Sequence, residues 1–214
     1  MIQIYLILII TIFLTAVSLN IVKKNFNGVV LYVLQSLAVS AMIFDSFINE
    51  GHKMMLLVFL LTFSLKVVVA PLFFSRLIKK HRLTFSATTY LSLPITLIII
   101  TILTILTHSN ILSALSSISK DNTAYLSMAL AVILISIFMV VNRKGVISQM
   151  IGILSLENGI VAFAFFAGLE QFPGLEIGII FNLCIWVVIA TAFASMIYKQ
   201  FGSLDVTTMK ILKD

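Results

Sequence analysis

Long apolar runs alternate with short polar segments along the whole chain. Each run approaches the roughly 20 residues that a helix needs to cross the hydrocarbon core of a bilayer. We place these runs at residues 1–22, 28–48, 54–75, 89–108, 123–141, 146–169 and 174–198. The pattern therefore predicts an all-α fold, a polytopic membrane helix bundle with about seven transmembrane helices.

Composition leads to the same class of protein. Of the 214 residues, 61% are hydrophobic and 10% are charged, whereas a soluble domain is about half apolar and about a quarter charged. Seven spans leave little chain for a soluble domain. The first run lacks the basic start and the small-residue cleavage site of a secretory signal, so we expect it to be retained as a helix.

Positive charges are concentrated in every second break between the runs. Cytoplasmic loops of membrane proteins carry an excess of Lys and Arg, which assigns these breaks to the cytoplasm. We therefore expect the N-terminus outside, the C-terminus inside, and the protein in the cytoplasmic (inner) cell membrane. The net charge of +6 is then a topology signal, and no nucleic-acid partner is expected. The basic residues on the predicted cytoplasmic side are Lys23, Lys24, Arg76, Lys79, Lys80, Arg82, Arg143, Lys144, Lys199, Lys210 and Lys213.

A weak internal repeat divides the chain into three parts. Residues 1–85 form one predicted three-helix unit, residues 86–122 a linking helix with an outer loop, and residues 123–214 a second three-helix unit with a cytoplasmic tail. Both units have a short basic turn that ends in glycine, at Gly28 and Gly145. Parallel repeats of this kind occur in transporters.

Two ionisable side chains lie near the middle of predicted spans. Glu157 and Lys66 would each cost roughly 2.5–3.5 kcal/mol at that depth, so such groups face a bundle interior or water and usually have partners. Three interpretations are open: a structural Lys66–Glu157 ion pair or neutral polar core, protonatable stations on a proton or ion path, or contact with a neighbouring subunit. Gln35 and Asn182 are weaker candidates, each able to form an interhelical hydrogen bond worth under about 2 kcal/mol.

Helix packing and helix irregularity are also predicted near these groups. Gly152, Ser155 and Gly159 fall on one sector of a helix and allow a second helix to approach closely, while Glu157 projects from the opposite side. Pro71 cannot donate to the carbonyl of residue 67 and is expected to kink or loosen the helix next to Lys66. Such an interruption fits either an ion site or an ordinary proline kink.

No cofactor is expected. The chain has one cysteine, Cys184, which excludes an internal disulfide and a cysteine-ligated iron–sulfur cluster within this chain. Metal-ligand spacing, a phosphate-binding glycine loop and a nucleophile elbow are not found in the sequence. We therefore expect no catalytic residue and no metal ligand.

The segment "VNRKGVISQMIGILSLENGIVAFAFF" (141–166) resembles the hydrogenase-4 component E family, membrane subunits of formate hydrogenlyase-type and related group 4 [NiFe]-hydrogenase complexes. The resemblance extends to "LQSL" (34–37), "LEIGI" (175–179) and the tail "GSLDVTTMKILK" (202–213). The second half is also similar to the small K subunit of respiratory complex I and to the C subunit of multisubunit sodium/proton antiporters. Two departures are the position of Glu157 relative to Gly152 and the presence of Asn182 where some relatives have an acid.

The resemblance implies a non-redox membrane subunit of a hydrogenase or complex I-like oxidoreductase, with a proton or sodium path through Glu157, Lys66, Asn158, Gln35 and Asn182. Its implied partners are antiporter-like membrane subunits, a [NiFe]-hydrogenase or quinone-reducing peripheral arm, and the lipid bilayer. Two alternatives are a purely structural scaffold in the same kind of complex and a stand-alone small-solute transporter.

Overall fold

The computed structural model describes residues 2–50, 53–80, 89–109, 122–168 and 178, and these residues form helices joined by short turns. No strand is present among them, apart from an isolated bridge between Thr89 and Arg143. The elements are α1 (Ile2–Ile21), α2 (Asn25–Glu50), α3 (Lys53–Thr62), the π-helix η1 (Phe63–Val69), α4 (Ala70–Lys80), α5 (Leu93–His108), α7 (Thr123–Asn142) and α8 (Val146–Phe166).

Five stretches are long and apolar enough to cross a membrane. They are Gln3–Ile21, Asn25–Asn49, Met55–Lys79, Thr123–Asn142 and Val146–Phe166. They correspond to five of the predicted runs, and the third contains α3, η1 and α4 as one continuous rod. The protein is thus an all-α bundle of membrane-spanning character.

The predicted run 89–108 contains a shorter helix than expected. Helix α5 has 16 residues and is roughly 24 Å long at 1.5 Å per residue, less than the roughly 30 Å of a bilayer core. Ser92 precedes the helix in an extended conformation, and Pro94 lies in its first turn, a position where its missing N–H is tolerated. The run 174–198 and the tail lie outside the described residues, so seven spans, the sidedness of the termini and the three-part division stay predictions.

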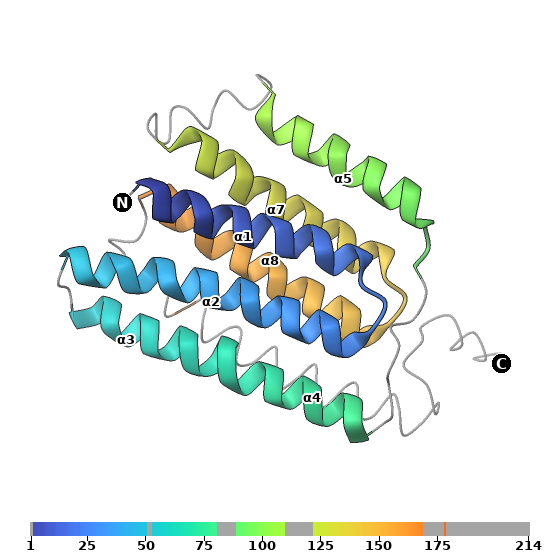
Figure 1. Cartoon of the computed structure of the whole chain (residues 1–214), viewed down its shortest axis with the longest axis horizontal. Coiled ribbons are helices and arrows are strands. Elements are labelled where there is room, and N and C mark those ends of the chain that lie inside the picture. Colours follow the sequence, from blue (N-terminus) through green and yellow to red (C-terminus); the bar gives the residue numbers. More distant parts are fainter. Residues whose placement is uncertain (1, 51–52, 81–88, 110–121, 169–177, 179–214) are drawn as a thin grey trace.

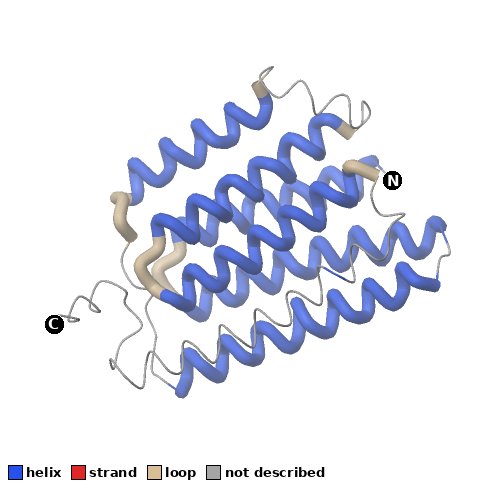
Figure 2. The backbone as a smooth tube through the Cα atoms, turned by 180° about the vertical axis from the view of Figure 1, so that it is seen from behind, coloured by secondary structure: helices blue, strands red, loops and turns tan. Residues whose placement is uncertain are grey.

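Four helices form the centre of the bundle: α1, α2, α7 and α8. Figure 1 shows α1 in front of α8, with α7 on one side of this pair and α2 on the other. Helix α7 packs most extensively against α8, α1 packs against α2 and α7, and α2 packs against α8. Helix α5 covers the outer side of α7, and the α3–η1–α4 rod covers the outer side of α2, as seen from behind in Figure 2.

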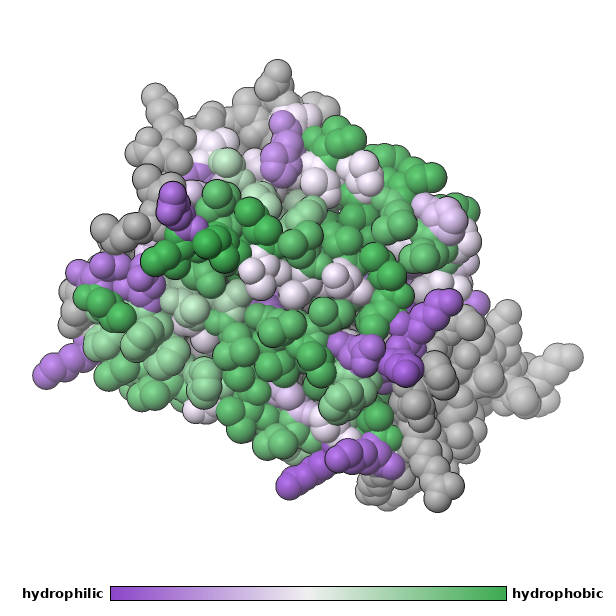
Figure 3. All heavy atoms as spheres, in the orientation of Figure 1, coloured by the Kyte–Doolittle hydropathy of each residue, from purple (hydrophilic) through white to green (hydrophobic). Residues whose placement is uncertain are grey.

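The described basic residues other than Lys66 gather mainly at one end of the bundle. The ends of α1, α4 and α7 and the starts of α2 and α8 all meet there (Figure 1). We call this the basic end; its charged residues are Lys23, Lys24, Arg76, Lys79, Arg143 and Lys144. Figure 3 shows a hydrophobic belt over the visible face, with hydrophilic residues mostly toward the two ends. That distribution is typical of a protein whose belt contacts lipid.

The interior is divided into two apolar clusters. One lies toward the end opposite the basic end and includes Ile12, Met42 and Ile135. The other lies toward the basic end and includes Phe74 and Ile151. On α8 the second cluster ends at residue 154 and the first begins at residue 161. Buried polar side chains occupy the level between them, and this level contains the candidate site.

Candidate functional site

Polar side chains from four segments of the bundle meet between the two apolar clusters, in what we call the polar layer. The level is unusual for a membrane protein interior because it includes a lysine and a glutamate. Lys66 is 0% exposed and Glu157 is 8% exposed. The members of the polar layer are Gln35 and Ser36 on α2, Lys66 on η1, Ser136 on α7, and Ser155, Glu157 and Asn158 on α8.

Lys66 is held by an amide and not by an acid. Its Nζ donates to Asn158 Oδ1 over 3.1 Å. The ion pair between Lys66 and Glu157 that the sequence left open is not formed among the described residues. The ammonium group and the carboxyl still interact electrostatically. A fully buried lysine with a neutral acceptor is an arrangement with a solvation cost, since a buried charge is usually paired.

A directed chain of hydrogen bonds continues from Asn158 across the bundle. Asn158 Nδ2 donates to Gln35 Oε1 over 3.3 Å and to Ser36 Oγ over 3.0 Å. Gln35 Nε2 donates to the main-chain carbonyl of Ile12 over 3.3 Å and to Ser155 Oγ over 3.0 Å. The chain begins at an ammonium that can only donate and reaches a carbonyl that can only accept, so both amide orientations are fixed by chemistry.

The chain ends at two serines between α8 and α7. Ser155 Oγ and Ser136 Oγ are 2.8 Å apart, and either hydroxyl can be the donor. With the Ile12 carbonyl, the hydrogen bonds connect η1, α8, α2, α1 and α7 at a single level. Because buried polar groups are costly unless they are satisfied, this network fixes how the five segments align along the bundle.

A π-helix aims Lys66 into this network. The buried positions Thr62, Lys66 and Ala70 are four residues apart, and in an α-helix each four-residue step rotates the side chain by roughly 40° beyond a full turn. The wider turns of η1 take more residues per turn and oppose this drift, so the three positions stay on one face. The N–H of Ala70 bonds to Leu65 O, five residues back.

Pro71 follows this wide turn directly. Since proline has no N–H, it could not have continued a regular α-helical ladder at that point. The sequence identified the interruption and its place next to Lys66, while the structure shows its form, a seven-residue π-helix. π-Helical turns are rare and occur frequently at functional sites.

Small residues bring α8 close to α7. An ideal Cβ placed on Gly159 would lie 3.0 Å from Val132 Cγ1 and 3.2 Å from the main-chain nitrogen of Ile133. At Gly152 the nearest atom would be Val140 Cγ2 at 2.9 Å. Ser155 lies between the two glycines on the same sector and bonds to α7. This sector thus packs against α7, and Asn158 and Glu157 project elsewhere.

Glu157 is buried, and one of its oxygens lacks a partner. Oε2 makes no hydrogen bond within the described part of the chain. Its electrostatic neighbours are Lys66 and the phenol of Tyr32. Among the described members of the polar layer, Glu157 is the residue with a buried oxygen that has no hydrogen-bond partner.

Sequence reasoning missed three polar residues in the polar layer or one helical turn from it: Ser36, Ser136 and Tyr32. Tyr32 is fully buried on α2, and its hydroxyl lies near Ser36 but not in hydrogen-bonding geometry. A buried hydroxyl without a partner costs about 1–3 kcal/mol. The missed signal was spacing: Tyr32, Gln35 and Ser36 stand at i, i+3 and i+4, which is one face of a helix.

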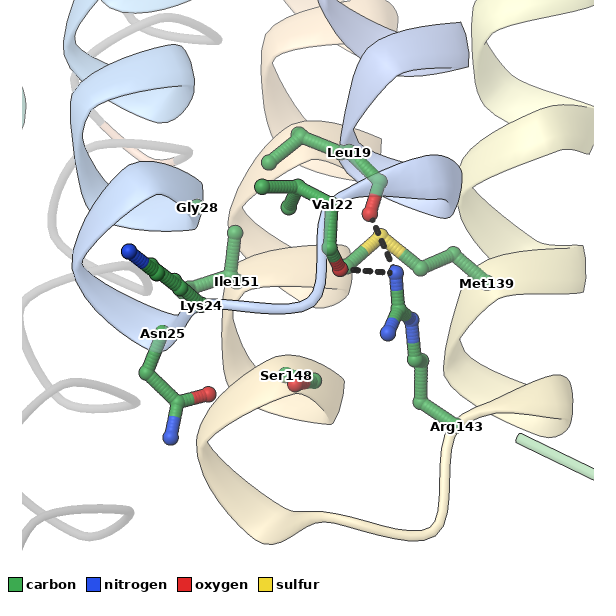
Figure 4. A pocket seen from close by; sticks show the side chains of 9 residues that line it. All are labelled: Leu19, Val22, Lys24, Asn25, Gly28, Met139, Arg143, Ser148 and Ile151. Carbon is green, nitrogen blue, oxygen red and sulfur yellow. Dashed lines mark hydrogen bonds between the residues drawn. The ribbon is translucent and has the colours of Figure 1, made fainter. Parts of the chain in front are cut away.

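A second buried cation, Arg143, holds the basic end together. Its Nη2 donates to the carbonyl oxygens of Leu19, Asn20 and Val22, each over 2.8 Å, at the end of α1 where helix carbonyls have no intrahelical donor. Figure 4 shows this guanidinium beside a small crevice with a volume of ≈ 10 Å³, room for about one water molecule. Burial lowers the pKa of Arg143 from its usual value. The sequence had assigned Arg143 only to membrane topology.

Asn182 lies outside the described residues, so its predicted place in an ion path stays a prediction. The described residues contain no group of three or more His, Cys, Asp or Glu side chains that could hold a metal ion. Comparison of the chain with protein-family models, curated proteins and solved structures found no match. The polar layer is therefore the basis for a functional proposal.

Proposed function

We propose that the chain is a non-redox integral membrane subunit that carries part of a proton path in an oxidoreductase complex of the hydrogenase-4 or complex I-like kind. The observation that carries the proton path is Glu157, a buried carboxyl group with an unpartnered oxygen beside a hydrogen-bonded polar layer. The kind of complex rests on the resemblance of residues 141–166 and of the tail. Sodium in place of the proton is an outcome of the test below.

Each member of the polar layer has a distinct role in this proposal. Glu157 takes up and releases the proton, and Lys66 supplies a nearby positive charge. Asn158 accepts a hydrogen bond from Lys66 over 3.1 Å and donates one to Gln35 over 3.3 Å, and so holds Lys66 in place. Ser36, Ser155 and Ser136 carry hydroxyls that can both accept and donate. Electron transfer takes place in partner subunits.

The scaffold function is the second candidate, favoured by the way these hydrogen bonds join five segments. It predicts that every polar substitution in the layer reduces assembly and that none changes ion transfer by the complexes that do assemble. The two functions therefore differ in the ratio of ions moved to electrons transferred, measured per assembled complex.

The deciding experiment is Glu157→Gln in the native membrane. Glutamine keeps the size of the side chain and removes its titration. We expect the complex to assemble and to transfer electrons while acidification of inverted vesicles falls. If vesicles with the parent complex take up sodium and their acidity does not change, the transported ion is sodium and not the proton. Normal acidification by the Gln variant would exclude Glu157 as a proton station.

Asp45→Asn is the matched control, because Asp45 lies on α2 near the end opposite the basic end, where it accepts a hydrogen bond from Asn49. It makes the same acid-to-amide change outside the polar layer, and acidification should stay normal. The double variant Glu157→Gln with Lys66→Met tests the structural ion-pair interpretation. If the two charges matter only to each other, the double variant restores assembly and full acidification.

The partners are tested by extraction in a mild detergent. We expect the chain to migrate with large antiporter-like membrane proteins and with a [NiFe] or quinone module. A stable isolated chain that transports a small solute in liposomes would overturn the proposal and favour the stand-alone transporter.

A further inference from the structure

Tyr32 is a fully buried polar side chain of α2, one helical turn from Ser36. It is 0% exposed, and its hydroxyl makes no hydrogen bond within the described part of the chain. The ring belongs to the apolar cluster near the basic end, with Ala70, Phe74 and Leu154. Phenylalanine would fill the same volume without burying an unpaired hydroxyl, so the hydroxyl reduces stability and gives nothing to packing.

The hydroxyl lies on a line from the basic end to the polar layer. Helix α2 starts at the basic end, and Gly28, Tyr32 and Ser36 follow one another at four-residue steps on one face. At 1.5 Å per residue, Tyr32 is roughly 10 Å along α2 from Asn25 and Ser36 is roughly 16 Å. Ser36 accepts a hydrogen bond from Asn158, which is the residue that holds Lys66.

Glu157 lies at the level of Ser36. It is roughly 16 Å along α8 from Val146, which also starts at the basic end, so Tyr32 is nearer to that end than the carboxyl group. Tyr32 and Glu157 interact electrostatically, and each has a buried oxygen without a hydrogen-bond partner among the described residues.

A crevice lies one helical turn from Tyr32 toward the basic end. Gly28, Ser148 and Ile151 line it, together with Arg143 (Figure 4). Ile151 also packs in the same apolar cluster as Tyr32. The crevice, Tyr32 and Glu157 thus form successive levels from the basic end to the middle of the bundle.

We propose that Tyr32 is a proton-relay residue that connects the crevice at the basic end to Glu157, an assignment that rests on the proposed proton path. Tyr32 and Glu157 are not hydrogen-bonded to each other, so each transfer passes through one water between them. The O–H bond of the phenol breaks as its proton moves to this water, and the water gives another of its protons to Glu157 Oε2, where a new O–H bond forms. A hydronium ion on the crevice side gives a proton to the phenol oxygen and becomes water. The phenol is neutral before and after the transfer, and no electron moves.

The test is Tyr32→Phe in the complete complex, with acidification and electron transfer measured per assembled complex. Because the hydroxyl makes no hydrogen bond, the variant should assemble as well as the parent and melt at the same or a higher temperature. Proton transfer contributed by one positioned group is typically worth 10²- to 10⁴-fold, so we expect protons moved per electron to fall by about 10-fold or more. Tyr32→His, which restores an exchangeable proton, should recover part of that loss.

Tyr90→Phe is the matched control. Tyr90 is exposed at the basic end, where Lys144 Nζ lies 4.9 Å from its ring centre, and loss of its hydroxyl should change nothing. Normal acidification by Tyr32→Phe overturns the relay assignment. If Glu157→Gln then still lowers acidification, the proton path stands without Tyr32, and if neither variant lowers it, both proposals fail. Loss of assembly in Tyr32→Phe would also overturn the assignment, since it would show that the hydroxyl is needed for folding or assembly.

Discussion

Lys66 and Arg143 are two buried cations in one bundle, and their surroundings differ. Arg143 is 4% exposed and donates to three main-chain carbonyls, each at 2.8 Å. Lys66 is 0% exposed and donates to one side-chain amide at 3.1 Å. The first cation satisfies the end of a helix, and the second depends on a chain of neutral side chains.

This difference matches the chemistry of the two residues. The guanidinium group keeps its proton and presents several fixed donors, which suits a permanent junction. The ammonium group of lysine is a compact charge that can lose its proton when buried. The acceptors of Arg143 are main-chain carbonyls, whereas the groups around Lys66 are side chains whose orientation is set by their hydrogen bonds to one another. The basic end is thus a fixed junction between helices, and the polar layer contains the side chains on which the proposed proton path depends.

The largest loss of stability is expected when Arg143 is replaced. Arg143→Met should lower the free energy of unfolding by about 2–4 kcal/mol, because carbonyls at the end of α1 lose a charged donor. Arg143→Lys should recover only part of this, since an ammonium lacks the planar donor geometry. The measurement is thermal or denaturant unfolding of the purified complex. Equal stability of Arg143→Met and the parent would contradict the junction role.

Separating α7 from α8 should disturb the polar layer and leave the hydrogen bonds between Arg143 and the end of α1 intact. Gly159→Ala brings a methyl group against Val132 and the main chain of Ile133 and should cost about 1–3 kcal/mol. Gly152→Ala serves as the matched comparison and should cost less, because the nearest main-chain atom of α7 lies at 3.4 Å there and at 3.2 Å at Gly159. Unfolding curves of the two variants, measured together, check the order. A larger loss of stability for Gly152→Ala than for Gly159→Ala would show that the main chain of α7 at Ile133 moves to make room for the added methyl group.

Removal of the second cation should affect function more than stability. Lys66→Met leaves Asn158 Oδ1 unpaired but also removes a buried charge, so we expect a net loss below about 2 kcal/mol. On the proposed proton path, ion transfer per electron should fall, in contrast to Arg143→Met, where each complex that still assembles should transfer ions normally. Lys53→Met, at the exposed start of the same rod, is the control. A stability loss as large as that of Arg143→Met would make the two cations equivalent.

The smallest effect is expected at Lys144, next to Arg143 in the chain. Its contact with the Tyr90 ring is worth about 0.5–1 kcal/mol at an exposed site, so Lys144→Met should lower stability by no more than that. The change in melting temperature, compared with that of Arg143→Met, is the measurement. A loss similar to that of Arg143→Met would mean that net charge at the basic end, and not the hydrogen bonds to α1, holds the junction.

The pattern of hydrophobic residues and prolines along the sequence predicted much of the fold. Five predicted runs correspond to helices that can span a membrane, and Pro71 correctly marked an irregular helix. The run 89–108 was read as a full span because periodicity does not show that the chain is extended before Leu93. There Asn142 accepts from Tyr90 through its carbonyl and from Leu91 through Oδ1, at 2.9 and 3.0 Å, so a contact distant in sequence fixes the start of α5.

The sequence predicted only some of the residues of the polar layer. Glu157 and Lys66 stand out in any apolar run, and Gln35 and Asn158 are polar enough to attract attention. Tyr32, Ser36 and Ser136 do not, because an isolated tyrosine or serine is common in membrane helices. Charge alone left open an ion pair between Lys66 and Glu157, whereas in the structure Lys66 donates to Asn158.

The sequence by itself determined the helical class, the membrane character and the polar residues within the spans, because hydrophobic length and charge are properties of consecutive residues. Only the tertiary structure decided the partners. Lys66 and Asn158 are 92 positions apart, and Asn158 and Gln35 are 123 apart. Their hydrogen bonds depend on the rotation of each helix about its axis, which close packing at Gly159 and the π-turn before Pro71 fix in three dimensions.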